Sequence, residues 1–295
     1  MRVNPNPYSD LLTAVSQTQQ QINTDEQQIS TGLSVNVPSD NPSAAAVLVR
    51  YADESVQADQ FQRSIGGVQG EMQNADSALN SVITALQQAV TLGVEGGNGT
   101  VNSADRAAIA TQVQGIQNQL ISLGNLTYQG NYVFGGTATQ TVPYVLDPTS
   151  PSGVTYQGNS GVNTVTLGSN FSLKTNMPGS QLFSASGTDM FKSIQDLING
   201  LTSGVGISAA VTEVGAASSS IDTQRVFYGN GLNQLSAQQT YLSSETTQLS
   251  QQQDIAGGAN LPAVITNLTT SEVALQATLQ TIGQTAHTNL FNYVK

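Results

Sequence analysis

The sequence has 295 residues, and 38% of them are hydrophobic, which is enough for at least one apolar core in a chain of two or three modest domains. Only 9% of the residues are charged, and 8 basic against 19 acidic residues give a net charge of -11, which disfavours nucleic acid and anionic membranes as partners. Cysteine is absent, which excludes disulfides, thiolate metal sites and cysteine nucleophiles.

Neither a membrane span nor a cleavable export signal is expected. No window of about 18 consecutive apolar residues occurs, and the first residues, MRVNPNPYSDLL, lack the basic region and apolar run of a signal peptide. We therefore expect a chain that either stays inside the cell or leaves by a route that reads no such signal.

An amphipathic helix is predicted for residues 8–29. Its seam alternates steps of three and four, the spacing of a coiled coil, and two of its seven positions are polar. The seam consists of Tyr8, Leu11, Val15, Thr18, Ile22, Asp25 and Ile29. Such a thin stripe makes the helix marginal when it is alone.

The carboxyl end repeats this spacing. The predicted stripe consists of Ile265, Leu268, Glu272, Leu275, Leu279, Ile282 and Ala286, and Tyr293 continues it to the last turn. Two weakly charged amphipathic helices at opposite ends of one chain need apolar partners. The nearest candidates are each other and neighbouring copies of the chain.

Between these ends, helices are predicted at about 42–92, 103–126, 190–201 and 221–254. Gly32 suits the position just after a helix, and Asn41 before Pro42 is typical of an N-cap followed by proline at the first helical position. Residues 128–183 are rich in Gly, Thr, Val and Asn, with alternation at Tyr144 and Leu146, and predict short strands and turns.

The predicted fold class is mainly α with a β-rich insertion. The two termini form a long antiparallel helical rod or coiled coil, and a small β domain lies in the middle. The expected parts are an N-terminal assembly helix (1–38), the first half of a helical rod (39–136), the β-rich outer insertion (137–185), the second half of the rod (186–254) and a C-terminal assembly helix (255–295).

The sequence gives little sign of catalysis. His287, the single histidine, lies in the predicted terminal amphipathic helix, where a structural or surface role is typical. No nucleophile elbow, phosphate-binding loop or His-Glu-x-x-His spacing occurs. Asp147 alone offers too few oxygen ligands for calcium. We therefore expect no enzyme activity, no cofactor and no metal.

Residues Gly130–Thr137 contain the element Gly-x-Tyr-x-Phe-x-Gly, the most specific of several motifs that occur in a fixed order along the chain. This element resembles the one through which the hook–filament junction branch of the bacterial flagellin-like axial proteins enters its outer domain. The other matching segments are Ile29–Gly32, Pro38–Pro42, Pro143–Tyr144, Val154–Gly158, Asn176–Phe183, Arg225–Asn233 and Leu261–Lys295. Leu33 and Gly231 stand where a basic residue is usual in the family, which we interpret as a change in inter-subunit ion pairs.

The resemblance implies a structural subunit that forms the junction between hook and filament and polymerises through its terminal helices. It also implies a homo-oligomeric ring, an adjacent hook-associated protein on one side, flagellin on the other, a cytoplasmic export chaperone, and secretion through the flagellar type III apparatus. Flagellin itself is the first alternative. A secreted adhesin or enzyme carried on the β insertion is the second.

Two sets of residues are predicted to carry these functions. The assembly interface is expected at Leu11, Val15, Ile22, Ile29, Leu268, Leu275, Leu279 and Ile282. The chaperone is expected to bind Leu261, Ile265, Leu268, Leu275, Leu279 and Ile282 as anchors of a helix in a groove.

Overall fold

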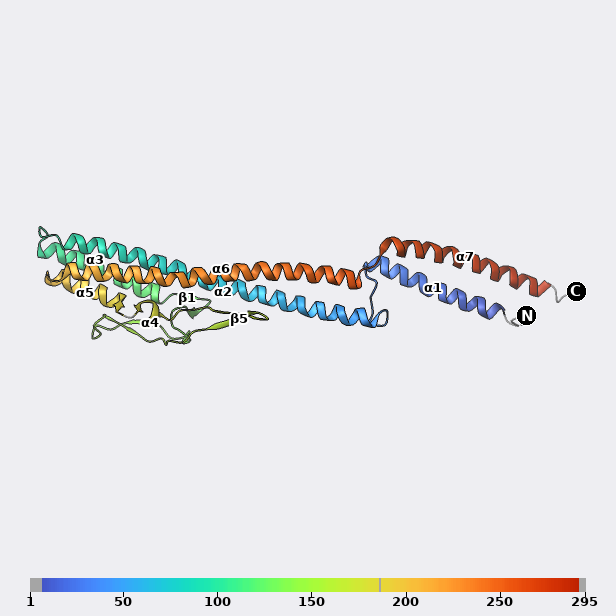
Figure 1. Ribbon diagram of the computed structural model, residues 1–295, viewed down its shortest axis with the longest axis horizontal. Helices are drawn as coiled ribbons and strands as arrows, with labels where there is room; N and C mark the ends of the chain where they lie inside the picture. The colour runs from blue at the N-terminus through green and yellow to red at the C-terminus, as the bar shows by residue number, and fades with distance from the viewer. Residues whose placement is uncertain (1–6, 186, 292–295) are drawn as a thin grey trace. The chain divides into compact units, whose positions relative to one another are not determined.

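The computed structural model describes residues 7–185 and 187–291. Its residues form two compact units, one made by the described residues up to Gln57 together with those from Ser244 onward, the other by Ala58–Ser243. Long helices at both ends and a small central region of strands confirm the predicted fold class (Figure 1). Two long helices, α2 (Pro42–Gly96) and α6 (Ile207–Gly257), contribute residues to both units.

In the first unit, helix α1 (Pro7–Thr31) lies beside helix α7 (Leu261–Phe291), and the two run in opposite directions (Figure 1). The expected continuation of the α7 stripe to Tyr293 lies outside the described residues, as does the side chain of His287. The antiparallel pairing of the two terminal helices therefore agrees with the prediction.

The ends of α1 and α6 are tied together by backbone hydrogen bonds. Ser34 N donates to Gly257 O at 2.7 Å, and Ala259 N donates to Gly32 O at 2.9 Å. Gly32 has φ +71°, a conformation that side chains rarely adopt, and the Asn41 side chain accepts from Ala44 N at 3.1 Å at the start of α2. Both predicted helix ends, Gly32 and Asn41, are thus confirmed.

The second unit is a helical layer of α2, α3 (Ser103–Gly124), α5 (Met190–Ser203) and α6, with the strands on one side of it (Figure 1). Helix α6 begins at Ile207, well before the predicted start at residue 221. Its first turns bury Ile207, Ala210, Val214 and Ala217 at steps of three and four, so the helical spacing extends before residue 221 and the prediction missed it.

The central region consists of four separate two-stranded antiparallel ladders and one short helix. The predicted alternation at Tyr144 and Leu146 lies in β3, whereas ladders of two residues are too short to show any periodicity. The elements are β1 (Thr127–Tyr128), β2 (Asn131–Tyr132), β3 (Tyr144–Leu146), β4 (Val154–Tyr156), β5 (Thr164–Gly168), β6 (Phe171–Lys174), α4 (Gly179–Leu182), β7 (Ser184–Ala185) and β8 (Thr188–Asp189).

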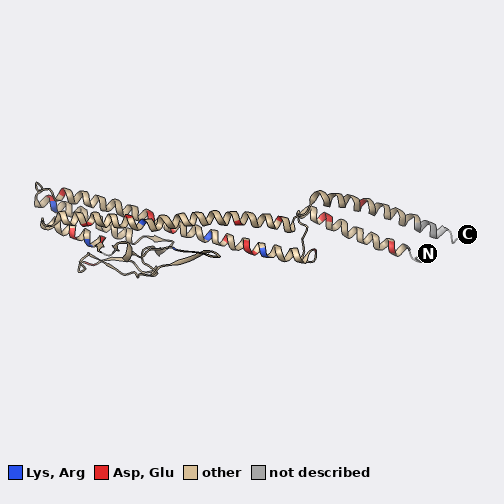
Figure 2. Cartoon of the chain, in the orientation of Figure 1, with Lys and Arg blue, Asp and Glu red and all other residues tan. Residues whose placement is uncertain are grey.

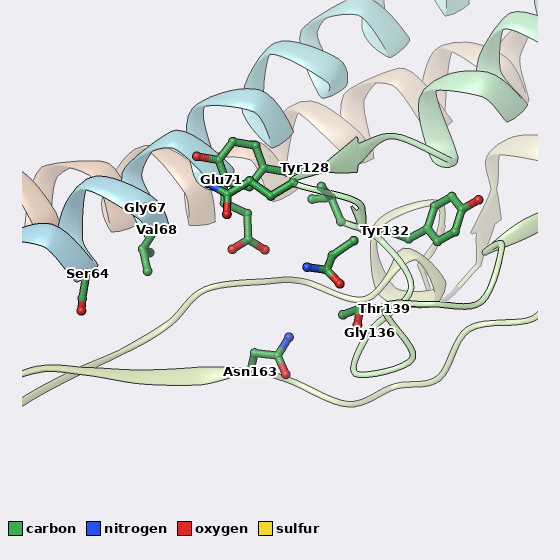
Figure 3. Close-up of a pocket in the computed structure, with 12 residues that line it drawn as sticks. Ser64, Gly67, Val68, Glu71, Tyr128, Tyr132, Gly136, Thr139 and Asn163 are labelled. Carbon is green, nitrogen blue, oxygen red and sulfur yellow. The ribbon is translucent and has the colours of Figure 1, made fainter.

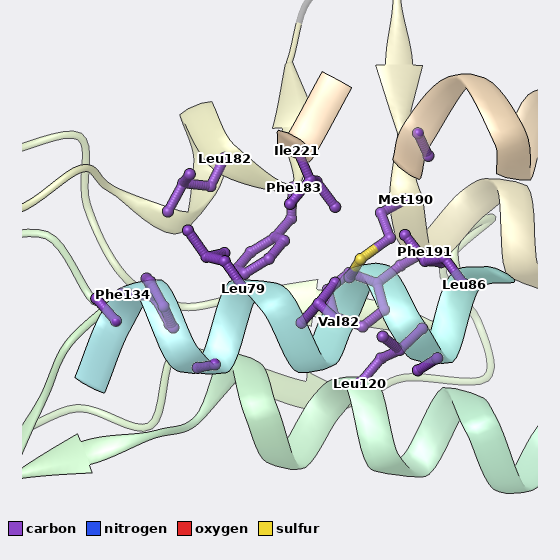
Figure 4. Packing of buried hydrophobic residues seen from close by; sticks show 14 of the residues in the cluster. Leu79, Val82, Leu86, Leu120, Phe134, Leu182, Phe183, Met190, Phe191 and Ile221 are labelled. Atoms are coloured by element: carbon purple, nitrogen blue, oxygen red, sulfur yellow. The ribbon is translucent and has the colours of Figure 1, made fainter. Parts of the chain in front are cut away.

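One continuous core holds the second unit together. Figure 4 shows Leu79, Val82 and Leu86 of α2 packed among the side chains of the other helices and the central region. An aromatic pair joins strand β3 to it, with the rings of Tyr144 and Phe183 edge to face at 5.7 Å between centroids. Because this core lies within Ala58–Ser243, the second unit has the apolar interior that the first unit largely lacks.

Candidate functional site

The terminal helix pair is the first candidate for a functional surface. On α1 the residues that are buried or half-buried follow one heptad seam, and Ile22 is the most covered apolar side chain at 5% exposed. The predicted interface residues Leu11, Val15, Ile22 and Ile29 all lie on this seam. Helix α1 packs against α7 of the same chain along this seam. The contact within one chain therefore already covers these residues.

Most large apolar residues of helix α7 lie on two adjacent faces, while Val273, 63% exposed, lies apart from both. The covered positions are Val264, Leu268, Ser271, Leu275, Thr278 and Ile282. The predicted stripe included Leu268, Leu275 and Ile282 but missed Val264, which is 7% exposed. Val264, Ser271 and Thr278 follow one another at steps of seven residues on the covered face. Because two of these three side chains are polar, the sequence shows no apolar repeat at these positions.

The other predicted α7 residues form an exposed outer strip, which consists of Leu261, Ile265 and Leu279. Their side chains are 40%, 52% and 50% exposed, respectively. At about 100° per residue, the strip lies roughly 70° around the helix from the centre of the covered face. The stripe predicted from the sequence therefore combined residues from two adjacent faces of α7, and α1 covers only one of these faces.

The helix pair carries very little charge (Figure 2). Within the described residues, α1 has Asp10, Asp25 and Glu26 and α7 has Glu272, with no lysine or arginine on either helix. Many threonine hydroxyls donate to the carbonyl four residues earlier, as Thr266 does to Pro262 O at 2.8 Å. Polar groups that are satisfied inside their own helix can be buried against a neighbour without losing a hydrogen bond.

Asp25 is a buried carboxylate in the α1 seam. It is 2% exposed, its Oδ1 accepts from Gln21 Nε2 at 2.9 Å, and its Oδ2 has no hydrogen-bond partner among the described residues. A buried acceptor without a partner costs about 1–3 kcal/mol. The seam is therefore weaker than its heptad spacing alone would indicate.

No arrangement for metal binding emerges from the described parts of the chain. They contain no group of three or more His, Asp or Glu side chains placed to hold a metal ion. Over the same residues, every helix is too short or too polar to cross a bilayer.

Comparison with known proteins finds flagellar relatives. Residues 4–139 match the model of the bacterial flagellin N-terminal helical region. Over 91% of this chain, and 92% of the relative, the sequence is 28% identical to flagellar hook-associated protein 3 of Escherichia coli K12. In sequence, the chain is thus similar to flagellar hook-associated protein 3 over most of its length and to the flagellin N-terminal region over residues 4–139.

Solved structures agree with this fold. FlgL of Bacillus cereus superposes with a TM-score of 0.60 at 21% identity, over 70% of this chain and 99% of that one. The flagellar junction protein FlgL of Legionella pneumophila superposes with a TM-score of 0.56 at 14% identity, over 65% of this chain and 99% of that one. At these identities the likeness concerns the fold alone.

Leu33 and Gly231 stand where the flagellin-like axial proteins usually have a basic residue, and the structure shows what surrounds each of them. Leu33 pairs with Gly258 in an isolated antiparallel bridge and keeps an exposed side chain. Gly231 on α6 lies directly against the Met72 side chain of α2. A long side chain at position 231 would therefore have to displace Met72.

Proposed function

We propose that this chain is a structural subunit of the bacterial flagellum that forms the junction between hook and filament, and that it polymerises through α1 and α7. The observation that carries the proposal is the outer strip on α7, an exposed apolar surface on a helix pair that the chain's own core does not cover. The similarity to hook-associated protein 3 over nearly the whole length supports the same role.

The helix pair suits packing among many copies. A Leu or Ile side chain contributes about 1.5–3 kcal/mol when it is fully buried, so Ile265 and Leu279, each about half exposed, would each gain about 1 kcal/mol against a neighbour. Glu272 lies seven residues from each of them on the same face, so its carboxylate must be paired or stay at the edge of the contact for that gain to be kept. A ring multiplies this contribution by the number of contacts.

The proposed partners follow from the position in the flagellum. Identical copies form the ring, an adjacent hook-associated protein lies on the hook side, and flagellin lies on the filament side. Residues 1–38 and 255–295 are the assembly helices in this proposal, and residues 137–185 form an outer insertion that needs no catalytic group.

We also propose that a cytoplasmic chaperone covers α7 before export through the flagellar type III apparatus. The anchors would be Leu261, Ile265, Leu268, Leu275, Leu279 and Ile282. In the folded chain α7 turns Leu268, Leu275 and Ile282 toward α1. A chaperone that uses all six residues must therefore bind α7 when α1 is detached from it, which fits a chain exported unfolded.

The chaperone is tested with a triple variant, Leu268→Asp, Leu275→Asp and Ile282→Asp. We expect weaker capture in a pull-down with the cognate chaperone and less protein in the culture supernatant, because three charges enter the apolar contact. Control Asp substitutions at exposed positions between Thr149 and Gly161 should change neither result. Normal capture and secretion of the triple variant would refute this part of the proposal.

The junction role is tested with chains that lack about the first 30 or the last 30 residues, expressed in cells without the wild-type protein. Electron micrographs should show hooks without filaments, while the second unit stays folded because its core lies within residues 58–243. A chain without both ends that still joins hook to filament would overturn the proposal. Abundance throughout the filament would instead identify flagellin.

A further inference from the structure

A cavity of about 330 Å³ opens in the second unit. It lies between α2 and the loops around the β1–β2 hairpin (Figure 3). Six of its lining residues carry polar side chains that matter here: Glu71, Tyr128, Asn131, Tyr132, Thr139 and Asn163. The volume is within the range of small-ligand sites, at about 300–1,000 Å³.

Glu71 is the one charged residue in the cavity wall. Figure 3 shows its carboxylate directed from α2 into the space toward the loops. Among the described residues it has neither an ion pair nor a hydrogen bond, and burial raises its pKa. Asp76, farther along the same helix, instead binds the Arg225 guanidinium through both oxygens at 2.9 and 3.0 Å.

The remaining wall supplies neutral oxygen atoms and aromatic rings. The Asn163 side chain points into the space (Figure 3), while the Asn163 backbone N–H is held by Asn176 Oδ1 at 2.7 Å. Asn131 Oδ1 accepts from Gln140 Nε2 at 2.6 Å. The tip of the Tyr128 ring lies against Gly70, where a side chain would collide with it. These contacts fix the cavity wall before any ligand enters.

We infer that this cavity binds a single cationic group, an alkylammonium or a guanidinium, with Glu71 as its counter-ion. An anion would meet the carboxylate, and a neutral ligand would leave that charge without a counter-ion in a partly desolvated site. A cation gains the carboxylate, amide and hydroxyl oxygens as acceptors and the Tyr128 ring beside Glu71 as a π-face (Figure 3). The cation comes either from a free amine or from a Lys or Arg side chain of a neighbouring protein.

The test uses the full chain with isotope-labelled tyrosine rings and follows the Tyr128 and Tyr132 resonances by NMR. Butylammonium and ethylguanidinium are the cationic probes, and 1-butanol is the neutral probe of similar size. Nα-acetyl-lysine methylamide presents the same ammonium on a piece of backbone. Glu71→Gln removes the charge with little change in shape, and Glu95→Gln, exposed on the same helix, is the matched control.

We expect saturable shifts with the cations, none at the same concentrations with butanol, and affinity lowered on the order of tenfold or more in Glu71→Gln, because a hydrogen bond to a charged group is lost. Glu95→Gln should bind as the wild type does. If the backbone-bearing probe binds as well as butylammonium, the site takes a side chain from a neighbour; if it is excluded, the site takes a free amine. Equal shifts with butanol, unchanged affinity in Glu71→Gln, or no saturable shift would each overturn the inference.

Discussion

The two faces of α7 predict different results for pairs of substitutions that are chemically alike. Replacing Ile265 and Leu279 by alanine removes half-exposed side chains, at 52% and 50% exposure, so each should change the stability of the monomer by no more than about 0.5 kcal/mol. In the assembled state each substitution forfeits about 1 kcal/mol of further burial. The double variant should therefore lose about 2 kcal/mol per copy, or roughly 30-fold in its incorporation equilibrium.

The assay is competition between variant and wild type in one cell. Both chains are expressed with distinct mass tags, and mass spectrometry compares their ratio in purified flagella with their ratio in secreted monomer. We expect depletion of Ile265→Ala/Leu279→Ala in the flagella without loss of helicity in the monomer. The control, Leu268→Ala/Leu275→Ala, should first lower monomer helicity because these residues face α1. Equal incorporation of the outer-strip variant would refute the assignment of that face.

Three further predictions concern the second unit. Leu79→Ala should cost about 2–5 kcal/mol of unfolding free energy in urea titrations, since Leu79 is fully buried, whereas Val94→Ala, at 62% exposure on the same helix, should stay within about 0.5 kcal/mol. Gly93→Ala should lower the melting temperature, because a Cβ there would lie 2.5 Å from Val211 Cγ2; an unchanged melting temperature would contradict this packing. Burial raises the pKa of Glu71, so the folded chain retains that proton to higher pH than the unfolded chain, and stability falls as pH rises through the folded pKa. Glu71→Gln should consequently be more stable than the wild type at pH 8, with a difference that shrinks toward pH 4; a constant difference would argue against a desolvated carboxylate.

The helical architecture could be predicted from the sequence because its signals are local. Apolar spacing defined α1 and α3, and the Gly32 and Asn41–Pro42 signals marked the ends of helices correctly. The start of α6 at Ile207 was missed although Ile207, Ala210, Val214 and Ala217 keep steps of three and four, because two of these four buried residues are alanines, which give the pattern little contrast. The ladders of two residues depend on contacts made by the whole central region.

The candidate surfaces could be predicted only in part from the sequence. Steps of three and four cannot tell which side of a stripe faces the partner helix, so Leu268 and Leu279 looked equivalent although only Leu279 is strongly exposed. The Glu71 cavity left no sequence signal at all. Its wall comes from α2, the β1–β2 hairpin and Asn163, which are brought together only by folding.

The most direct test of the junction role is the position of the chain in intact flagella. A gold label on a tag in the exposed turn near Thr149 should appear at one place per flagellum, between the hook and the first filament subunits, in electron micrographs of cells that depend on the tagged chain. Label along the whole filament would identify a flagellin, and flagella with no label at the junction would contradict the proposed function.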